Sequence, residues 1–70
     1  MITKNDKRLG RRIRRLRRQR QLTQRQLAEI VQVTEKYIQY LEAAKRLPRL
    51  KLLYRIARAL RVGVKDLFPF

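Results

Sequence analysis

The sequence of 70 residues predicts an all-α domain, and three observations support this fold class. Apolar residues recur at spacings of three and four, which is the period of a helix with one buried face. Threonines stand just before two of these apolar patterns, where helix caps are expected. No stretch shows the alternation of apolar and polar residues that marks a half-buried strand. A chain of this length supports one compact core, so a single domain is expected.

The first predicted helix covers residues 7–21 and is strongly basic. Residues 1–5 are expected to form a flexible N-terminal arm, and residues 6–70 the folded domain, with Asp6 as a candidate helix cap. Leu9, Ile13 and Leu16 form one narrow apolar stripe. Nine of the other residues are lysine or arginine: Lys7, Arg8, Arg11, Arg12, Arg14, Arg15, Arg17, Arg18 and Arg20. Like charges four residues apart destabilise a helix by about 0.2–0.5 kcal/mol per pair, so this helix predicts either a use for its charge or a requirement for counter-ions.

Two short helices, residues 24–31 and 35–42, form the middle of the chain. Thr23 and Gln26 have the spacing of a capping box, in which each side chain accepts a hydrogen bond from the other residue's backbone N–H. Thr34 is placed to cap the second helix. Each helix is only about two turns long, too short to be stable alone. Both must therefore pack through their apolar residues, which are Leu27, Ala28, Val31, Ile38 and Leu41.

The last third of the chain predicts a connector, a fourth helix and a final turn. Pro48 disfavours helix at the preceding residue, so 43–49 is read as the connector. The fourth helix covers 50–60, with Leu50, Leu53, Ile56, Ala57 and Leu60 on its buried face. Gly63 can cap a last helical turn over 64–68, which would bring Leu67 and Phe68 onto the core.

The composition excludes several function classes. Twenty lysines and arginines against five acids give a net charge of +15, which indicates a polyanionic partner, with nucleic acid first. Cysteine and histidine are absent and the acids are dispersed, so no metal site, cofactor or enzyme activity is expected. The apolar runs are too short to span a bilayer, and charge interrupts any signal peptide. A cytoplasmic protein with no membrane or small-molecule partner is expected.

Five motifs in fixed order resemble the Cro/repressor-like helix-turn-helix DNA-binding domains of the XRE family. They are L-T-Q-x-x-L-A, V-T-x-x-Y-I-x-x-L-E, K-R-x-P, L-x-x-I-A-x-A-L-x-V and D-L-F, and the resemblance runs from Leu9 to Phe68. It implies a compact five-helix bundle of the lambda-repressor-like type, whose second and third helices form the helix-turn-helix. It also implies a prokaryotic or phage transcription regulator, associated with the nucleoid, that binds operator DNA.

The same resemblance implies which residues contact double-stranded DNA. The third helix of such proteins enters the major groove with its first residues at the base edges. Gln24 is expected at a backbone phosphate or an adenine, with Arg25 as a second phosphate contact. Lys36 suits guanine and Glu35 suits cytosine. The full set is Gln24, Arg25, Thr34, Glu35, Lys36, Gln39, Tyr40, Lys45, Arg46 and Arg49.

Each of these residues also has a purely structural interpretation. Glu35 can favour the helix dipole and Thr34 can act only as a cap. Tyr40 can lie over Lys36, one turn earlier, as a surface contact. The charges of the connector can simply be solvated. The resemblance further implies a buried ion pair between Arg17 and Glu42, in which removal of one partner would cost about 3–5 kcal/mol.

Three positions depart from the family pattern. Gln32 stands where glycine is usual between the second and third helices, Ala43-Ala44 where Asn-Gly is usual, and Arg61 where glycine ends the fourth helix. If these positions keep a left-handed backbone, each non-glycine residue costs about 1 kcal/mol. Alternatively, the turns are remodelled.

The sequence leaves two main functions open. The first is a regulator that binds a palindromic operator as a homodimer through its C-terminal end, where Val62, Val64, Phe68 and Phe70 offer apolar area. The second is a general nucleic-acid-binding or compaction protein, which the excess charge of the first helix supports. A membrane-active first helix is a weaker reading, because its apolar stripe is expected in the core.

Overall fold

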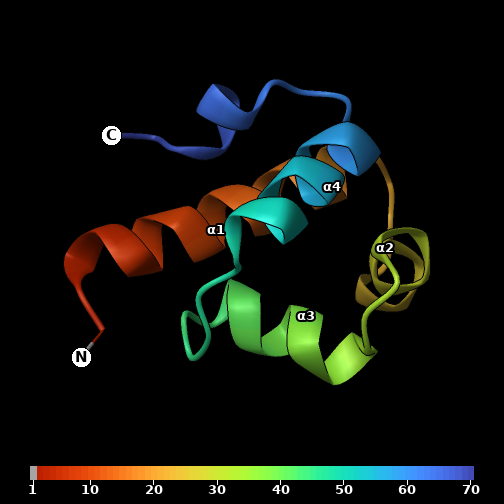
Figure 1. Cartoon of the computed structure of the whole chain (residues 1–70), viewed down its shortest axis with the longest axis horizontal. Coiled ribbons are helices and arrows are strands. Elements are labelled where there is room, and N and C mark those ends of the chain that lie inside the picture. The colour runs from red at the N-terminus through yellow and green to blue at the C-terminus, as the bar shows by residue number, and fades with distance from the viewer. Residues whose placement is uncertain (1) are drawn as a thin grey trace.

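The computed structural model describes residues 2–70 and contains four α-helices and one 3-10 helix over that range. The helices are α1 (Lys4–Gln19), α2 (Gln24–Val31), α3 (Glu35–Glu42), α4 (Leu50–Leu60) and η1 (Val64–Leu67). The bounds predicted for α2, α3 and α4 are confirmed. In Figure 1, α3 lies below α1, α4 crosses in front of α1, and the C-terminal segment returns above α1 toward the end where the chain begins.

The first helix begins earlier than predicted. Thr3 is its N-cap, because the Thr3 hydroxyl accepts from the Asp6 N–H and the Asp6 carboxylate accepts from the Thr3 N–H. Asp6 therefore occupies the third helical position of a capping box rather than the cap itself. The expected arm over residues 1–5 overlaps the helix at residues 4 and 5, and Met1 lies outside the described residues.

The fifth element is a single 3-10 turn rather than a full α-helix. The Gly63 N–H donates to the Asp66 carboxylate, and the Asp66 N–H donates to the Gly63 carbonyl at 2.9 Å. Phe68 is extended, as expected for the residue before Pro69. The predicted five-helix bundle is thus four α-helices with a 3-10 turn in the fifth place. Leu67 is fully buried and Phe68 is packed against the core.

One hydrophobic core joins all five elements. Its members come from the predicted apolar faces, and the side chains with no exposed surface are Leu27, Ile38, Ile56, Leu60 and Leu67. Leu50, predicted on the buried face of α4, is instead 62% exposed, because it stands in the first turn beyond the edge of the core. The core fixes α2 against α3 and α4, and α3 against α1.

The turns keep a left-handed backbone despite the missing glycines. Gln32, Ala44 and Arg61 have φ angles of 63°, 61° and 58°. The alternative of remodelled turns is therefore wrong at these positions. Gln21, at the end of α1, adopts the same conformation with φ of 58°, which the sequence analysis did not foresee. Each such residue costs about 1–2 kcal/mol relative to a right-handed conformation.

Candidate nucleic-acid interface

The exposed side of α3 is polar because its apolar residues all face the core. Ile38 and Leu41 are buried, whereas Glu35, Lys36 and Gln39 are exposed. The Thr34 hydroxyl caps the helix by accepting from the Tyr37 N–H at 3.1 Å. The first turn of α3 therefore presents one acidic and one basic side chain side by side, free of partners among residues 2–70 other than Tyr40.

Lys36 and Tyr40 interact with each other on this surface. The Lys36 ammonium lies 5.8 Å from the centre of the Tyr40 ring, within the range of a cation–π contact. An exposed contact of this kind contributes about 0.5–1 kcal/mol. The surface contact between Tyr40 and Lys36 that the sequence offered as a structural interpretation is thus formed in the free protein. This contact also holds the Lys36 side chain along the helix.

Arg17 and Glu42, the pair expected from the resemblance, form a buried ion pair with two hydrogen bonds. Arg17 Nε donates to Glu42 Oε2 at 2.6 Å, and Arg17 Nη2 donates to Glu42 Oε1 at 3.1 Å. Arg17 Nη1 donates to the Leu22 carbonyl at 2.7 Å. The side chains are only 8% and 4% exposed. This contact fastens α1, the start of the α2 segment and the end of α3 to one another.

Gln24 joins the same network from the surface. Its Nε2 donates to Glu42 Oε1 at 3.0 Å, and its side chain is half-buried at the first position of α2. A side-chain amide has two N–H donors and a carbonyl oxygen. One donor is held by Glu42, so the other donor and the oxygen remain for a ligand. The Gln24 amide is consequently held in place by the fold itself.

The other residues expected at phosphates lie on the surface around α2 and α3. Arg25 pairs with Glu29 one turn on, with 3.3 Å between Nε and Oε1, but both side chains are mostly exposed. Such a pair contributes little and can be exchanged for a phosphate. Lys45, Arg46 and Arg49 are exposed, and no side-chain hydrogen bond engages them within residues 2–70. Their roles at DNA stay predictions.

Gly10 brings α1 against the end of α3, and the sequence analysis missed it. A Cβ atom at this position would lie 2.7 Å from the Glu42 carbonyl oxygen and 2.8 Å from that of Leu41. Distances this short exclude any side chain without backbone movement. A lone glycine inside a helical pattern was the available signal, since it often marks close approach of another backbone.

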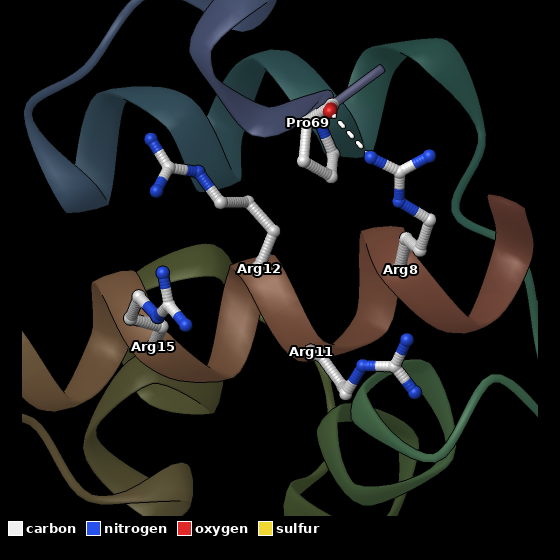
Figure 2. A pocket seen from close by; sticks show the side chains of 5 residues that line it. All are labelled: Arg8, Arg11, Arg12, Arg15 and Pro69. Carbon is white, nitrogen blue, oxygen red and sulfur yellow. Dashed lines mark hydrogen bonds between the residues drawn. The ribbon is translucent and has the colours of Figure 1, made fainter.

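The arginines of the first helix divide into two groups. Four of them bind acceptors within the fold: Arg17 as above, and three others that donate to backbone carbonyls near the C-terminus. Arg8 Nη2 donates to Pro69 at 2.8 Å, Arg12 Nε to Asp66 at 3.0 Å and Arg20 Nε to Leu60 at 2.9 Å. Figure 2 shows Arg8 and Arg12 turned toward the C-terminal segment.

The second group has no acceptor in the described part of the chain. Arg11, Arg14, Arg15 and Arg18 are all exposed and appear in no ion pair or side-chain hydrogen bond of residues 2–70. Arg8 and Arg12 flank one edge of the apolar stripe and Arg20 follows the end of α1, whereas these four lie on the side of α1 away from the core. Their positions around the helix were readable in the sequence, but the acceptors were not.

Residues 2–70 contain no helix that is both long and apolar enough to cross a membrane. The same residues contain no group of three or more acidic, histidine or cysteine side chains arranged to hold a metal ion.

Comparison with known proteins places this geometry among gene regulators. A family model described as helix-turn-helix matches residues 13–67. The restriction-modification controller protein C.AhdI from Aeromonas hydrophila is 29% identical, with a TM-score of 0.86 over 89% of this chain and 94% of that one. The clp gene regulator ClgR from Corynebacterium glutamicum is 28% identical, with a TM-score of 0.88 over 96% and 71%.

A third similar structure contains DNA. It is the P22 c2 repressor protein in complex with a synthetic operator, which is 26% identical, with a TM-score of 0.82 over 87% of this chain and 92% of that one. The comparison with curated protein sequences found no match.

Proposed function

Because this chain belongs to the helix-turn-helix family of the XRE, or Cro/C1, type, we propose that it is a transcription regulator that binds a specific sequence of double-stranded DNA. The observation that carries the proposal is the exposed polar side of α3, anchored at its end by the buried Arg17–Glu42 pair. A rigid α3 can enter the major groove with its first turn at the base edges.

The base-reading residues of the proposal are the exposed side chains of α3. Lys36 donates to guanine O6 and N7, and Glu35 accepts from cytosine N4. Gln39 and Tyr40 follow one turn later, within reach of the next base pair or the backbone. The Lys36 ammonium leaves the Tyr40 ring when it binds, at a cost of about 0.5–1 kcal/mol. The Thr34 hydroxyl adds a contact to DNA only if it donates to the DNA while it still accepts from the Tyr37 N–H.

The proposed phosphate contacts flank α3 on both sides. Gln24 offers its second amide donor at the start of α2, where the unpaired backbone N–H groups also favour an anion. Arg25 exchanges Glu29 for a phosphate. Lys45 and Arg46 follow the backbone from the connector, and Arg49 lies farther along toward the minor groove. These contacts set the position on DNA without reading its sequence.

A homodimer on a palindromic operator completes the proposal. Half-sites about 34–36 Å apart would place two copies of α3 in successive major grooves. The proposed interface is the C-terminal end. Val62, Val64 and Phe68 are partly buried within the subunit, whereas Phe70 is 55% exposed, lies edge-on against Phe68 and carries the Arg8 guanidinium 5.4 Å from its ring centre. A regulator of this kind would act in the prokaryotic cytoplasm, at the nucleoid.

The alternative is binding to any nucleic acid through net charge. The arginines without an acceptor on α1 favour it, because they add charge away from α3. This alternative requires similar affinity for every duplex and a steep dependence on salt.

Selection from a random pool of duplex DNA, at near-physiological salt, separates the two functions. Enrichment of an inverted repeat supports a dimeric operator reader, and enrichment of a single half-site supports a monomeric one. Retention without enrichment contradicts sequence-specific binding and leaves the charge-driven alternative. A Lys36→Ala protein run in parallel should lose preference at one base position only, which shows that α3 does the reading.

A further inference from the structure

The outer side of α1 carries four arginines that the fold does not use. We call Arg11, Arg14, Arg15 and Arg18 the arginine face. They line a shallow hollow of about 570 Å³ together with Gln19. A second hollow of about 190 Å³, shown in Figure 2, continues it toward Arg8, Arg12 and Pro69. Apart from Gln19 and Pro69, the residues that line both hollows are arginines, which contribute their aliphatic stems as well as their guanidinium groups.

No acid in the described chain neutralises this face. Asp6 and Asp66 accept from the backbone N–H groups of the N-caps Thr3 and Gly63, Glu29 pairs with Arg25, and Glu42 pairs with Arg17. Glu35 stands on α3. The pairs Arg11–Arg15 and Arg14–Arg18 are one turn apart and repel each other by about 0.2–0.5 kcal/mol each. The face is therefore destabilising for the free protein and is relieved by a bound polyanion.

The arginine face points in a different direction from the exposed side of α3. Gly10 and Arg17 mark the side of α1 that touches the end of α3. Arg11 and Arg18 come one residue later, which is about 100° farther round the helix, and Arg15 lies farther still. Arg14 stands near the edge that faces α3, and Figure 2 shows the Arg11 side chain directed away from the C-terminal segment, toward the side of α1 on which α3 lies. A straight duplex seated on α3 is not expected to reach Arg15 and Arg18.

We propose that the arginine face binds the phosphate backbone of a second DNA duplex segment while α3 holds the first, so that one protein molecule bridges two segments. The inference rests on the proposed DNA-binding function of α3. It assigns a separate role to the excess charge of α1, which the reading of an operator does not need.

The dimensions of the face suit a phosphate backbone. Arg11 and Arg18 are seven residues apart, which is about 10.5 Å along the helix. Duplex DNA presents one charge per about 3.4 Å of each strand, so about three phosphates lie along this length. Arginine also donates through a planar fork that matches phosphate oxygens. An acidic peptide would supply a less regular row of charges.

A two-duplex capture experiment tests the proposal. One duplex is fixed to beads and saturated with the full chain, and a second, fluorescent duplex is added after washing. The test variant is Arg11→Gln/Arg15→Gln/Arg18→Gln. The matched control, Lys51→Gln/Arg58→Gln/Lys65→Gln, removes the same charge from exposed positions of α4 and η1. Thermal unfolding and binding of each protein to the bead duplex are recorded separately.

The wild type and the control are expected to capture the second duplex. The test variant should bind the bead duplex within about threefold of wild type and lose capture by about tenfold or more, because three of the four guanidinium groups proposed to hold the second phosphate backbone are removed. Failure of the wild type to bind the bead duplex would instead refute the proposed function. Failure of the proposed function is therefore distinguishable from failure of the bridging inference.

Four results would overturn the inference. The first is no capture by the wild type. The second is full capture by the test variant, which would mean that the two α3 helices of a dimer each bind one duplex. The third is an equal loss of bead binding and capture, which would place the arginines on the first duplex. A polyglutamate peptide retained in place of the second duplex would also contradict it and indicate an acidic protein partner.

Discussion

The side-chain amide of Gln24 donates a hydrogen bond to the buried carboxylate of Glu42, with 3.0 Å between Nε2 and Oε1. This bond connects a surface residue that is expected to contact DNA with the ion pair that fastens α1 to α3. Binding and stability are thus expected to be joined at one carboxylate, and substitutions at Glu42 and at its two partners, Arg17 and Gln24, should separate them.

Glu42→Ala is expected to destabilise the domain by about 3–5 kcal/mol, because Arg17 would remain buried without its partner. Urea unfolding followed by circular dichroism measures this. The double variant Arg17→Met/Glu42→Leu should lose much less, since no charge is left buried. A single variant as stable as wild type would mean that water reaches the Arg17 guanidinium.

Gln24→Ala is expected to affect DNA binding more than folding. Glu42 keeps both bonds to Arg17, so the loss of one further hydrogen bond should cost only about 0.5–1.5 kcal/mol of stability. Affinity for a selected operator should fall several-fold when measured by fluorescence anisotropy well below the unfolding temperature. Gln26→Ala, also on α2 but directed at the cap of Thr23, serves as a control that should lower stability without comparable loss of affinity.

Glycine at the left-handed positions should stabilise the protein. Gln32→Gly and Arg61→Gly each relieve a positive φ on an exposed residue, and the net gain after the added freedom of the unfolded chain is about 0.5–1 kcal/mol. Differential scanning calorimetry tests this. Gln39→Gly, inside α3 with an ordinary helical backbone, should destabilise by about 1 kcal/mol instead.

Alanine at Gly10 should destabilise the bundle by about 1–3 kcal/mol, because its methyl group would collide with two backbone carbonyls at the end of α3. Gly63→Ala is the matched control: there the nearest atom is a side-chain oxygen of Asp66 at 3.2 Å, which can shift. Equal unfolding midpoints for the two variants would contradict the close approach of α1 and α3.

Substitution of Lys36 and of Lys45 should separate recognition of the base sequence from attraction to the phosphate backbone. Lys36→Ala should cost about 1–3 kcal/mol at the base pair that it contacts and relax preference there. Lys45→Ala should weaken binding to all sequences alike and reduce the salt slope by about 0.9. Titrations of both variants against a selected operator and a scrambled duplex, at several salt concentrations, measure the two effects. Loss of base preference in Lys45→Ala would place the connector in the groove.

Much of the fold was readable from local signals. The capping box of Thr23 and Gln26, the cap at Thr34 and the apolar spacing gave the bounds of α2, α3 and α4, because caps and periodicity act within a few residues. The same reading failed at the start of α1, where Thr3 rather than Asp6 is the cap. It also gave the last element as a helical turn without distinguishing a 3-10 from an α-helix, a difference that depends on one hydrogen bond.

The sequence by itself determined the helical class, the position of the helix-turn-helix and the polar character of α3. Only the tertiary structure decided which arginines serve the fold. Arg8, Arg12 and Arg20 find their carbonyl acceptors 61, 54 and 40 residues away, whereas the neighbouring Arg11, Arg14, Arg15 and Arg18 find none within residues 2–70. Charge and spacing are properties of the chain, whereas an acceptor within 3 Å exists only after distant backbone segments have packed together.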